Sequence, residues 1–173
     1  MTDYIKRKLT LVKVSCNGEI LGCVHDDFKS DREIVLAAVH SREWALQYAH
    51  DDLKRDREIV LAAVSTSGYG LNYAHNDLNR DREIVIRAVS NNGLVLKNVH
   101  DDLKQDPEIV MIALKHNIVL LEFVPTAYHE YISAYTPNPD PIYNLEQIIK
   151  DSKIAKNTQY LKRFHTDVVF VFN

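Results

Sequence analysis

Cysteine, glycine and proline are all scarce in this chain, and tryptophan occurs once. Its 173 residues include 2 cysteines, 5 glycines and 5 prolines. Two cysteines, Cys16 and Cys23, are too few for a disulfide framework and suit a reducing compartment. So little glycine and proline excludes a collagen-like chain and low-complexity disorder. These scarcities indicate an ordinary globular protein, and we expect it in the cytoplasm.

Long hydrophobic runs and a strong net charge are missing as well. No apolar run in the sequence approaches the roughly 20 residues that a membrane-spanning helix needs. Residues 1–9 are charged and lack an apolar core, so we expect no secretory signal there. The formal net charge is −3, which argues against broad binding to phosphate backbones. The composition therefore favours a protein partner over nucleic acid, with no membrane span.

The sequence does contain a repeat with a step of 25 residues. The string DREIV begins at Asp31 and returns at Asp56 and Asp81, and the looser copy DPEIV begins at Asp106. Residues 31–55 and 56–80 are identical at 16 of 25 positions. A degenerate copy precedes them in the same register, and the end copies are atypical, as capping repeats usually are. We therefore expect five units, at 6–30, 31–55, 56–80, 81–105 and 106–130.

Each unit has the pattern of two short helices. Asp31 is a typical N-cap residue, and Pro107 in the fifth unit stands where a first helical residue would be. Gly68 and Gly93 would supply a left-handed stop after this helix. A second helix is expected over about residues 44–53, with a narrower apolar stripe. The wide apolar arc of the first helix places it in the inner layer of an all-α solenoid of helical hairpins.

Two segments allow further predictions. Residues 9–24 also fit a β-hairpin around an Asn-Gly turn, which is the alternative to helices in the first unit. The repeat stops after residue 130, so residues 131–173 form a C-terminal extension with a proline-rich linker at 136–141. Within this extension we expect a short helix at 144–156. The β-prone run at 168–172 would dock on the array or on a partner.

Recurring histidines and paired aspartates suggest a catalytic or metal site, but geometry opposes it. Equivalent residues of successive helical units lie about 10 Å apart, too far to share one zinc ion. We therefore expect no metal and no cofactor, and expect the histidines to form hydrogen bonds between units. Adjacent carboxylates such as Asp51 and Asp52 diverge on a helix. An enzyme would need a site where the array meets the extension, using His129, Tyr131 or His165.

Departures from the repeat mark candidate binding residues. Trp44, Tyr69 and Leu94 share one position near the turn, and Arg42 stands beside it only in the second unit. Aromatic and arginine side chains are typical interface anchors. These four residues predict a non-catalytic protein–protein interaction scaffold. The alternative is that Trp44 and Tyr69 only cover the inner helices.

A single-stranded RNA-binding module is the other function that a helical repeat allows. Some helical repeats read one base per unit, and the turn position varies from unit to unit here, at residues 17, 42, 67, 92 and 117. Every unit carries acidic residues, however, and these would repel phosphates. Protein binding is therefore the leading hypothesis.

The unit pattern resembles a known family. The string DREIVLAAV with its following G, L and YA is similar to the domain-of-unknown-function family numbered 4116, over about residues 31–118. That family forms tandem arrays in large DNA viruses, some bacteria and unicellular eukaryotes. The resemblance implies a repeat scaffold with no established activity, in a cytoplasm that could be a host's, and it carries over no catalytic residue.

Overall fold

The computed structural model describes residues 2–116 and 118–124, except for the side chains of Thr2, Ile118, Val119 and Leu121. The chain divides into two compact units, Met1–Phe123 and Val124–Asn173, and all described elements lie in the first. Every one of these elements is helical, so the repeats form an all-α array. The end of the fifth unit, the linker, the helix at 144–156 and the strand at 168–172 lie outside the described residues and stay predictions.

Each described unit contributes one α-helix to one layer and one 3-10 helix to a second layer, and a short helical segment then leads to the next unit. The α layer contains α1 (Thr2–Cys16), α3 (Arg32–Ser41), α5 (Arg57–Thr66), α6 (Arg82–Asn91) and α7 (Pro107–His116). The 3-10 layer contains η1 (Gly18–Cys23), η2 (Glu43–Tyr48), η3 (Gly68–Tyr73), η5 (Gly93–Asn98) and η7 (Ile118–Phe123). The connecting segments are α2 (Asp26–Lys29), α4 (Asp51–Lys54), η4 (Asn76–Arg80) and η6 (Leu103–Gln105).

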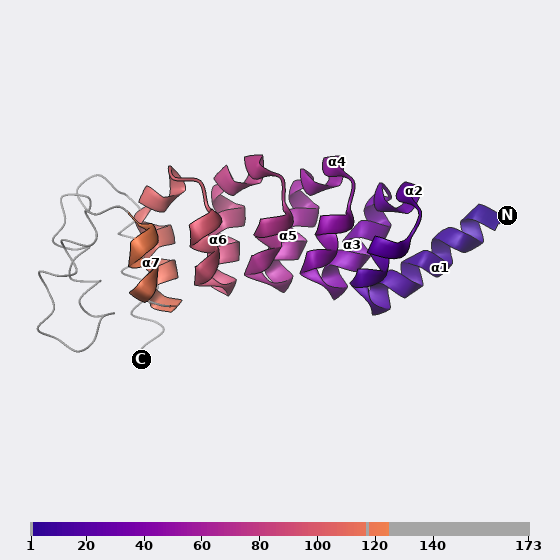
Figure 1. Cartoon of the computed structure of the whole chain (residues 1–173), viewed down its shortest axis with the longest axis horizontal. Coiled ribbons are helices and arrows are strands. Elements are labelled where there is room, and N and C mark those ends of the chain that lie inside the picture. Colours follow the sequence, from indigo (N-terminus) through magenta and orange to yellow (C-terminus); the bar gives the residue numbers. More distant parts are fainter. Residues whose placement is uncertain (1, 117, 125–173) are drawn as a thin grey trace, which may run out of the picture. The chain divides into compact units, whose positions relative to one another are not determined.

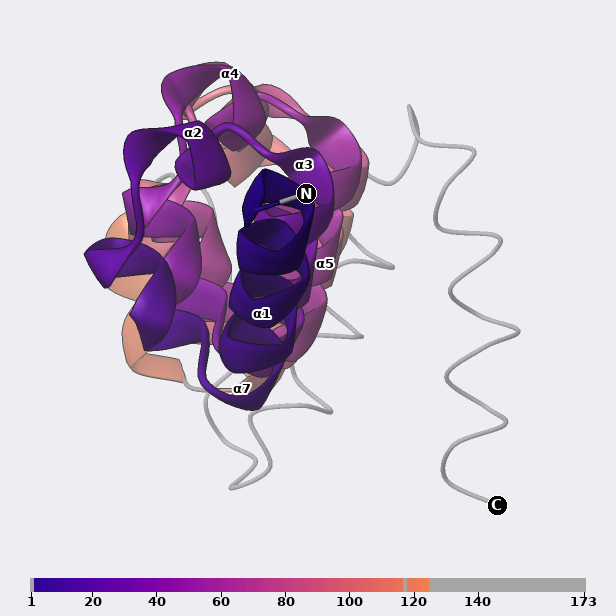
Figure 2. The same cartoon turned by 90° about the vertical axis from the view of Figure 1, so that its right-hand side faces the viewer.

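Successive units pack side by side in chain order. The α-helices contact one another in the order α1, α3, α5, α6, α7, and the 3-10 helices do the same. Figure 1 shows α3, α5, α6 and α7 next to one another, with α2 and α4 at the same end of their units. In Figure 2, α1 lies in front of α3 and α5. Each unit therefore buries its apolar residues against its neighbours.

The helices α3, α5, α6 and α7 begin at the predicted aspartate caps. The Asp31 side chain accepts hydrogen bonds from the backbone N–H groups of Glu33 and Ile34, and Asp56 and Asp81 do the same in their units. Asp106 accepts from the N–H of Glu108 at 2.9 Å, with Pro107 as the first helical residue. The cap assignment is confirmed, because each carboxylate satisfies amides that the first turn leaves without a partner.

The β-hairpin alternative for residues 9–24 is wrong, since α1 and η1 are both helical. The glycine prediction is also wrong, because no described residue has a positive φ. The α-helix ends instead at an extended residue, such as Ser67 with φ −156° and ψ 137°. Gly68 is then the first residue of η3. A different constraint therefore selects glycine at this position.

The predicted second helix over residues 44–53 is two segments. η2 ends at Tyr48, Ala49 and His50 are extended, and α4 starts at Asp51. The break arises because His50 caps α4, and its own N–H donates to the carbonyl of Lys29 in the preceding unit. That inter-unit bond needs an extended backbone, so a continuous α-helix cannot form here.

The core lies between the two layers. The helices α3, α5 and α6 each bury an isoleucine, a valine, an alanine and a valine, which in α3 are Ile34, Val35, Ala38 and Val39. The 3-10 helices add pairs such as Val95 and Leu96. Periodic burial of this kind lets each unit depend on its neighbours for a complete core.

Candidate interaction surface

The predicted anchor residues lie at equivalent places in the 3-10 layer. Trp44, Tyr69 and Leu94 are each the second residue of their 3-10 helix, in η2, η3 and η5. These helices contact one another in that order. Tyr69 is 37% exposed and Leu94 is 45% exposed, whereas Trp44 is half-buried. We call these three residues together with Arg42 the anchor row.

Arg42 has a specific relation to Trp44. Its guanidinium carbon lies 5.6 Å from the centre of the Trp44 ring, within the range of a cation–π contact. Arg42 is exposed and is the N-cap of η2, but its side chain makes no capping hydrogen bond. The second unit therefore presents a cation and an aromatic ring together, where the third unit presents Ser67 and Tyr69.

The turn residues considered for RNA recognition have a local role. Asn17, Ser67 and Asn92 each accept a hydrogen bond from the backbone N–H two residues later, and so cap η1, η3 and η5. The N–H to side-chain oxygen distances are 3.1, 3.4 and 3.0 Å. Their variation is compatible with capping, because asparagine and serine are both good caps.

An arginine in each of α1, α3, α5 and α6 reaches the next unit. Arg7 Nε lies 2.6 Å from Asp31 Oδ2, and Arg7 Nη2 lies 2.6 Å from Glu33 Oε2. Arg32 pairs in the same way with Asp56 and Glu58. The same clamp recurs from Arg57 to Asp81 and Glu83, and from Arg82 to Asp106 and Glu108. We call this contact the arginine clamp.

The arginine clamp changes the electrostatics of the capping carboxylates. The Arg7 hydrogen bond, with help from two backbone amides, lowers the pKa of Asp31 below its usual value despite some burial. Burial alone would raise the pKa of Asp56 and Asp81, but the arginine and the capped amides outweigh it and lower the pKa. These aspartates are therefore charged at neutral pH, and each supports a helix start and a joint between units.

Glycine leaves room where the 3-10 helices of the first and third units approach the α-helix of the next unit. A Cβ atom on Gly68 would lie 2.3 Å from the carbonyl oxygen of Ala88, and one on Gly18 would lie 2.3 Å from that of Ala38. Both positions lack a side chain because the neighbouring backbone occupies its place. The second unit has Glu43 at this position.

The histidines at the 25-residue step cap the connecting segments. In His25, His50, His75 and His100, Nδ1 lies 3.3–3.4 Å from the backbone N–H nitrogen two residues later. Two rings also meet a neighbouring unit, because Arg55 Nη2 lies 2.7 Å from His75 Nε2 and Arg80 Nη2 lies 2.6 Å from His100 Nε2. The expected inter-unit hydrogen bond is confirmed for these two histidines.

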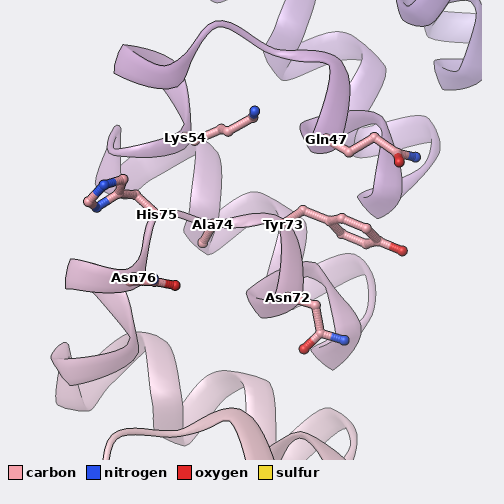
Figure 3. Close-up of a pocket in the computed structure, with 7 residues that line it drawn as sticks. All are labelled: Gln47, Lys54, Asn72, Tyr73, Ala74, His75 and Asn76. Carbon is pink, nitrogen blue, oxygen red and sulfur yellow. The ribbon is translucent and has the colours of Figure 1, made fainter.

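A hollow of about 330 Å³ lies between the second and third units. It is lined by Gln47, Lys54, Asn72, Tyr73, Ala74, His75 and Asn76. Figure 3 shows Gln47, Asn72 and Tyr73 toward one side of it and His75 and Asn76 toward the other. It is wide open to solvent, so it is a shallow groove. It lies at the joint where Glu43 replaces glycine.

The described residues offer neither a metal site nor a membrane-spanning helix. No group of three or more histidine, cysteine, aspartate or glutamate side chains there could hold a metal ion. No helix among those residues is long and apolar enough to span a membrane. His129, Tyr131 and His165, the residues expected for an enzyme site, lie outside the described residues.

Two exposed apolar features were not predicted from the sequence. Tyr48 in η2 is 38% exposed, although it lies in the segment predicted as a helix. On α1, the side chains of Tyr4, Ile5, Leu9 and Val12 are between 52% and 61% exposed. The exposure of Leu9 could have been found by comparing it with Ile34 one repeat later, because α3 has a neighbouring α-helix on both sides.

Comparison with known proteins identifies the repeat. A family described as Domain of unknown function (DUF4116) matches the chain three times in tandem, at residues 9–42, 38–79 and 81–128. These matches cover more of the chain than the motif in units two to four and extend into the first and fifth units. No curated protein and no solved structure matches it. The chain belongs to the DUF4116 family of repeats.

Proposed function

We propose that the array is a non-catalytic scaffold that binds a protein partner through the anchor row. The observation that carries this proposal is the exposure of Tyr69 and Leu94 at equivalent positions of successive units. Among the described residues outside α1, the exposed large apolar side chains are Tyr48, Tyr69 and Leu94. Tyr69 and Leu94 belong to the anchor row, and Tyr48 does not. Exposed apolar groups that recur at the unit spacing form one extended surface. Apolar residues scattered singly over a protein form no such surface.

The chemistry of the row suits a protein partner. Tyrosine, tryptophan and arginine are the residue types that contribute most to protein interfaces. Equivalent positions in neighbouring units are about 10 Å apart, so three of them span about 20 Å. That length corresponds to about six residues of extended peptide or about four turns of helix. A partner segment of ordinary size can therefore contact all four residues at once.

The test is capture of partners by the full chain from a lysate of its own cells, with matched variants. The variant Tyr69→Ala/Leu94→Ala removes two row side chains. The control Tyr48→Ala removes a tyrosine of nearly equal exposure, 38% against 37%, that lies outside the row. We expect the double variant to lose at least one specific partner that the wild type and the control both retain. Equal capture by all three proteins would contradict the proposal.

At three of the turn positions that RNA recognition would use, residues 17, 67 and 92, the side chains already cap 3-10 helices. A titration with labelled single-stranded RNA at low salt separates the two functions. The scaffold proposal predicts no saturable binding, and the arginine clamp explains why, since its arginines are engaged by acidic side chains. Saturable, salt-sensitive binding would favour RNA instead.

A cytoplasmic location is part of the same proposal. Cys16 and Cys23 are both exposed and carry free thiols. Exposed unpaired cysteines suit a reducing compartment. Alkylation of intact cells, followed by mass spectrometry, is expected to find both thiols reduced, and a large oxidised fraction would contradict the assignment.

A further inference from the structure

One side of α1 is apolar and exposed, although its central position is buried in each later repeat. Leu9 is 52% exposed, whereas its counterparts Ile34 and Ile59 are 0% exposed. Ile5 and Val12 lie one turn before and one turn after Leu9 on the same side of the helix, and they are 58% and 61% exposed. In Figure 2 this end of the array faces the viewer, with α1 in front of α3. We call Ile5, Leu9 and Val12 the α1 stripe.

At the internal joints each α-helix packs against the α-helix of the preceding unit: α3 against α1, α5 against α3, and α6 against α5. Ile34, at the position of Leu9, is fully buried. Cys16 extends the stripe by one turn, and its counterpart Ser41 also belongs to a joint. The backbone N–H of Gly18 donates to Ser41 Oγ at 3.2 Å across that joint. In the next unit, therefore, the residue at the position of Leu9 is buried and the residue at the position of Cys16 contacts the preceding unit.

The charges around the α1 stripe are the reverse of those at the internal joints. Asp31 and Glu33 receive the arginine of the preceding helix, and the residues at their positions on α1 are Lys6 and Lys8. A helix that carried the repeat's arginine would bring a third cation to these lysines. Lys13 adds another positive charge at the position where α3 has buried Ala38. The face therefore selects against a helix of the repeat's own kind.

We propose that α1 is a docking site for an amphipathic helix of a partner protein, one that carries acidic side chains where the repeat's α-helices carry arginine. Two observations support this occupant. The first is continuity with the internal joints, because the residue at the position of Leu9 is buried in α3, α5 and α6 and the residue at the position of Cys16 in α3 contacts the preceding unit. The second is charge complementarity with Lys6 and Lys8. The proposal uses none of the anchor row, so it is tested independently of the proposed function.

The test uses two helix-stapled peptides that differ in one residue. Both contain residues 55–68, which include α5 and its clamp arginine; one keeps Arg57 and the other carries Arg57→Glu. Cys16 reports docking through its rate of alkylation in the full chain, and the exposed Cys23 is the internal reference. We expect the glutamate peptide to slow alkylation of Cys16 alone. It should bind about fivefold more tightly than the arginine peptide, as two exposed charge pairs would give.

A charge-reversal variant supplies the matched control. Lys6 and Lys8 are exposed, so Lys6→Glu/Lys8→Glu is expected to leave the fold unchanged, as circular dichroism can verify. In this variant the preference should reverse, and the arginine peptide should protect Cys16 better. A reversal would not occur if the peptides bound to the apolar stripe without regard to charge.

Four results would overturn the proposal. One is that neither peptide slows alkylation of Cys16 at concentrations up to about 1 mM. Another is equal protection by both peptides. Slow alkylation of Cys16 in the free chain would show that another segment of this chain covers the stripe. Protection by vesicles of phosphatidylserine and phosphatidylcholine, where the glutamate peptide gives none, would assign the face to a membrane surface.

Discussion

The aspartate that begins each α-helix contacts both its own helix and the preceding unit. The Asp56 side chain caps α5 through the N–H groups of Glu58 and Ile59, and it receives Arg32 from the preceding unit. Its side chain is only 23% exposed. Losing it removes a helix cap and leaves one end of the arginine clamp without a partner.

We therefore expect Asp56→Ala to lower the free energy of unfolding by about 1–3 kcal/mol. The control is Asp52→Ala. The Asp52 side chain is 88% exposed, and its carboxylate lies against the ring of His50. That variant should stay within about 0.5 kcal/mol of the wild type. Urea unfolding of the full chain, followed by circular dichroism, measures both. An equal loss of unfolding free energy in the two variants would show that the cap and the clamp at Asp56 add no stability.

The lowered pKa values of Asp31, Asp56 and Asp81 predict a dependence of stability on acid. Because the folded pKa lies below the unfolded value of about 3.9, the unfolded chain takes up protons first as the pH falls. The stabilisation is therefore complete above about pH 5 and is lost as the pH falls through the folded pKa values. Urea midpoints measured between pH 7 and pH 2.5 should fall in the acid range. The same midpoint at pH 6 and pH 3 would contradict this.

Prediction from sequence succeeded for the cap and failed for its arginine partner. A cap is a contact over two or three residues, so one string around Asp31 is enough to predict it. The arginine clamp joins residues 24 and 26 positions apart, as from Arg7 to Asp31 and Glu33. Its prediction would have required knowing which end of each helix faces the next unit. The recurrence of Asp, Arg and Glu in one string was the available signal.

At the scale of elements, the 3-10 layer and its glycines differ most from expectation. Apolar periodicity predicted one helix over residues 44–53, because six residues of 3-10 helix place Ala45 and Leu46 on the same side as an α-helix would. It could not show the extended break at Ala49 and His50, which depends on a hydrogen bond to Lys29 in another unit. The expected stop at Gly68 followed from the usual role of glycine after a helix, but the neighbouring backbone determines the residue here.

This difference gives a prediction at the element scale. Gly68→Ala places a Cβ 2.3 Å from the Ala88 carbonyl oxygen, so we expect a loss of about 1–3 kcal/mol. Gly22→Ala is the matched control, since its Cβ would meet only the Tyr48 ring at 3.0 Å or more. That ring can shift, and the stiffer unfolded chain offsets the contact, so the change should stay within about 1 kcal/mol. Thermal unfolding of the two variants measures this difference. Equal losses of stability would show that the Ala88 carbonyl does not exclude a side chain at position 68.

At the scale of the whole array, the units beside a repeat determine how far a side chain at a given repeat position is buried and how much it stabilises the fold. Ile59 lies between two units and is 0% exposed, whereas Leu9 at the same repeat position is 52% exposed. We expect Ile59→Ala to cost about 2–5 kcal/mol. Leu9→Ala should cost less than about 1 kcal/mol. Urea unfolding of the two variants measures this contrast, and similar losses would show that α1 is covered in the full chain.

The anchor row was predicted from departures from the repeat, and the structure adds how far each residue is exposed. Tyr69 and Leu94 are more exposed than Trp44, a difference that the repeat pattern could not show because all three residues share one repeat position. The α1 stripe was not predicted, since Leu9 matches the repeat and only its surroundings differ. Sequence periodicity thus identifies positions, while exposure depends on which units lie beside them.

The most direct test of the scaffold proposal is a photo-cross-linking scan of the full chain in its own cells. A photoreactive side chain is placed in turn at Trp44, Tyr69, Leu94 and Tyr48. We expect the three row positions to cross-link to the same protein species and Tyr48 not to cross-link to it. Cross-linking that is equal at Tyr48, or absent from the three row positions, would contradict it.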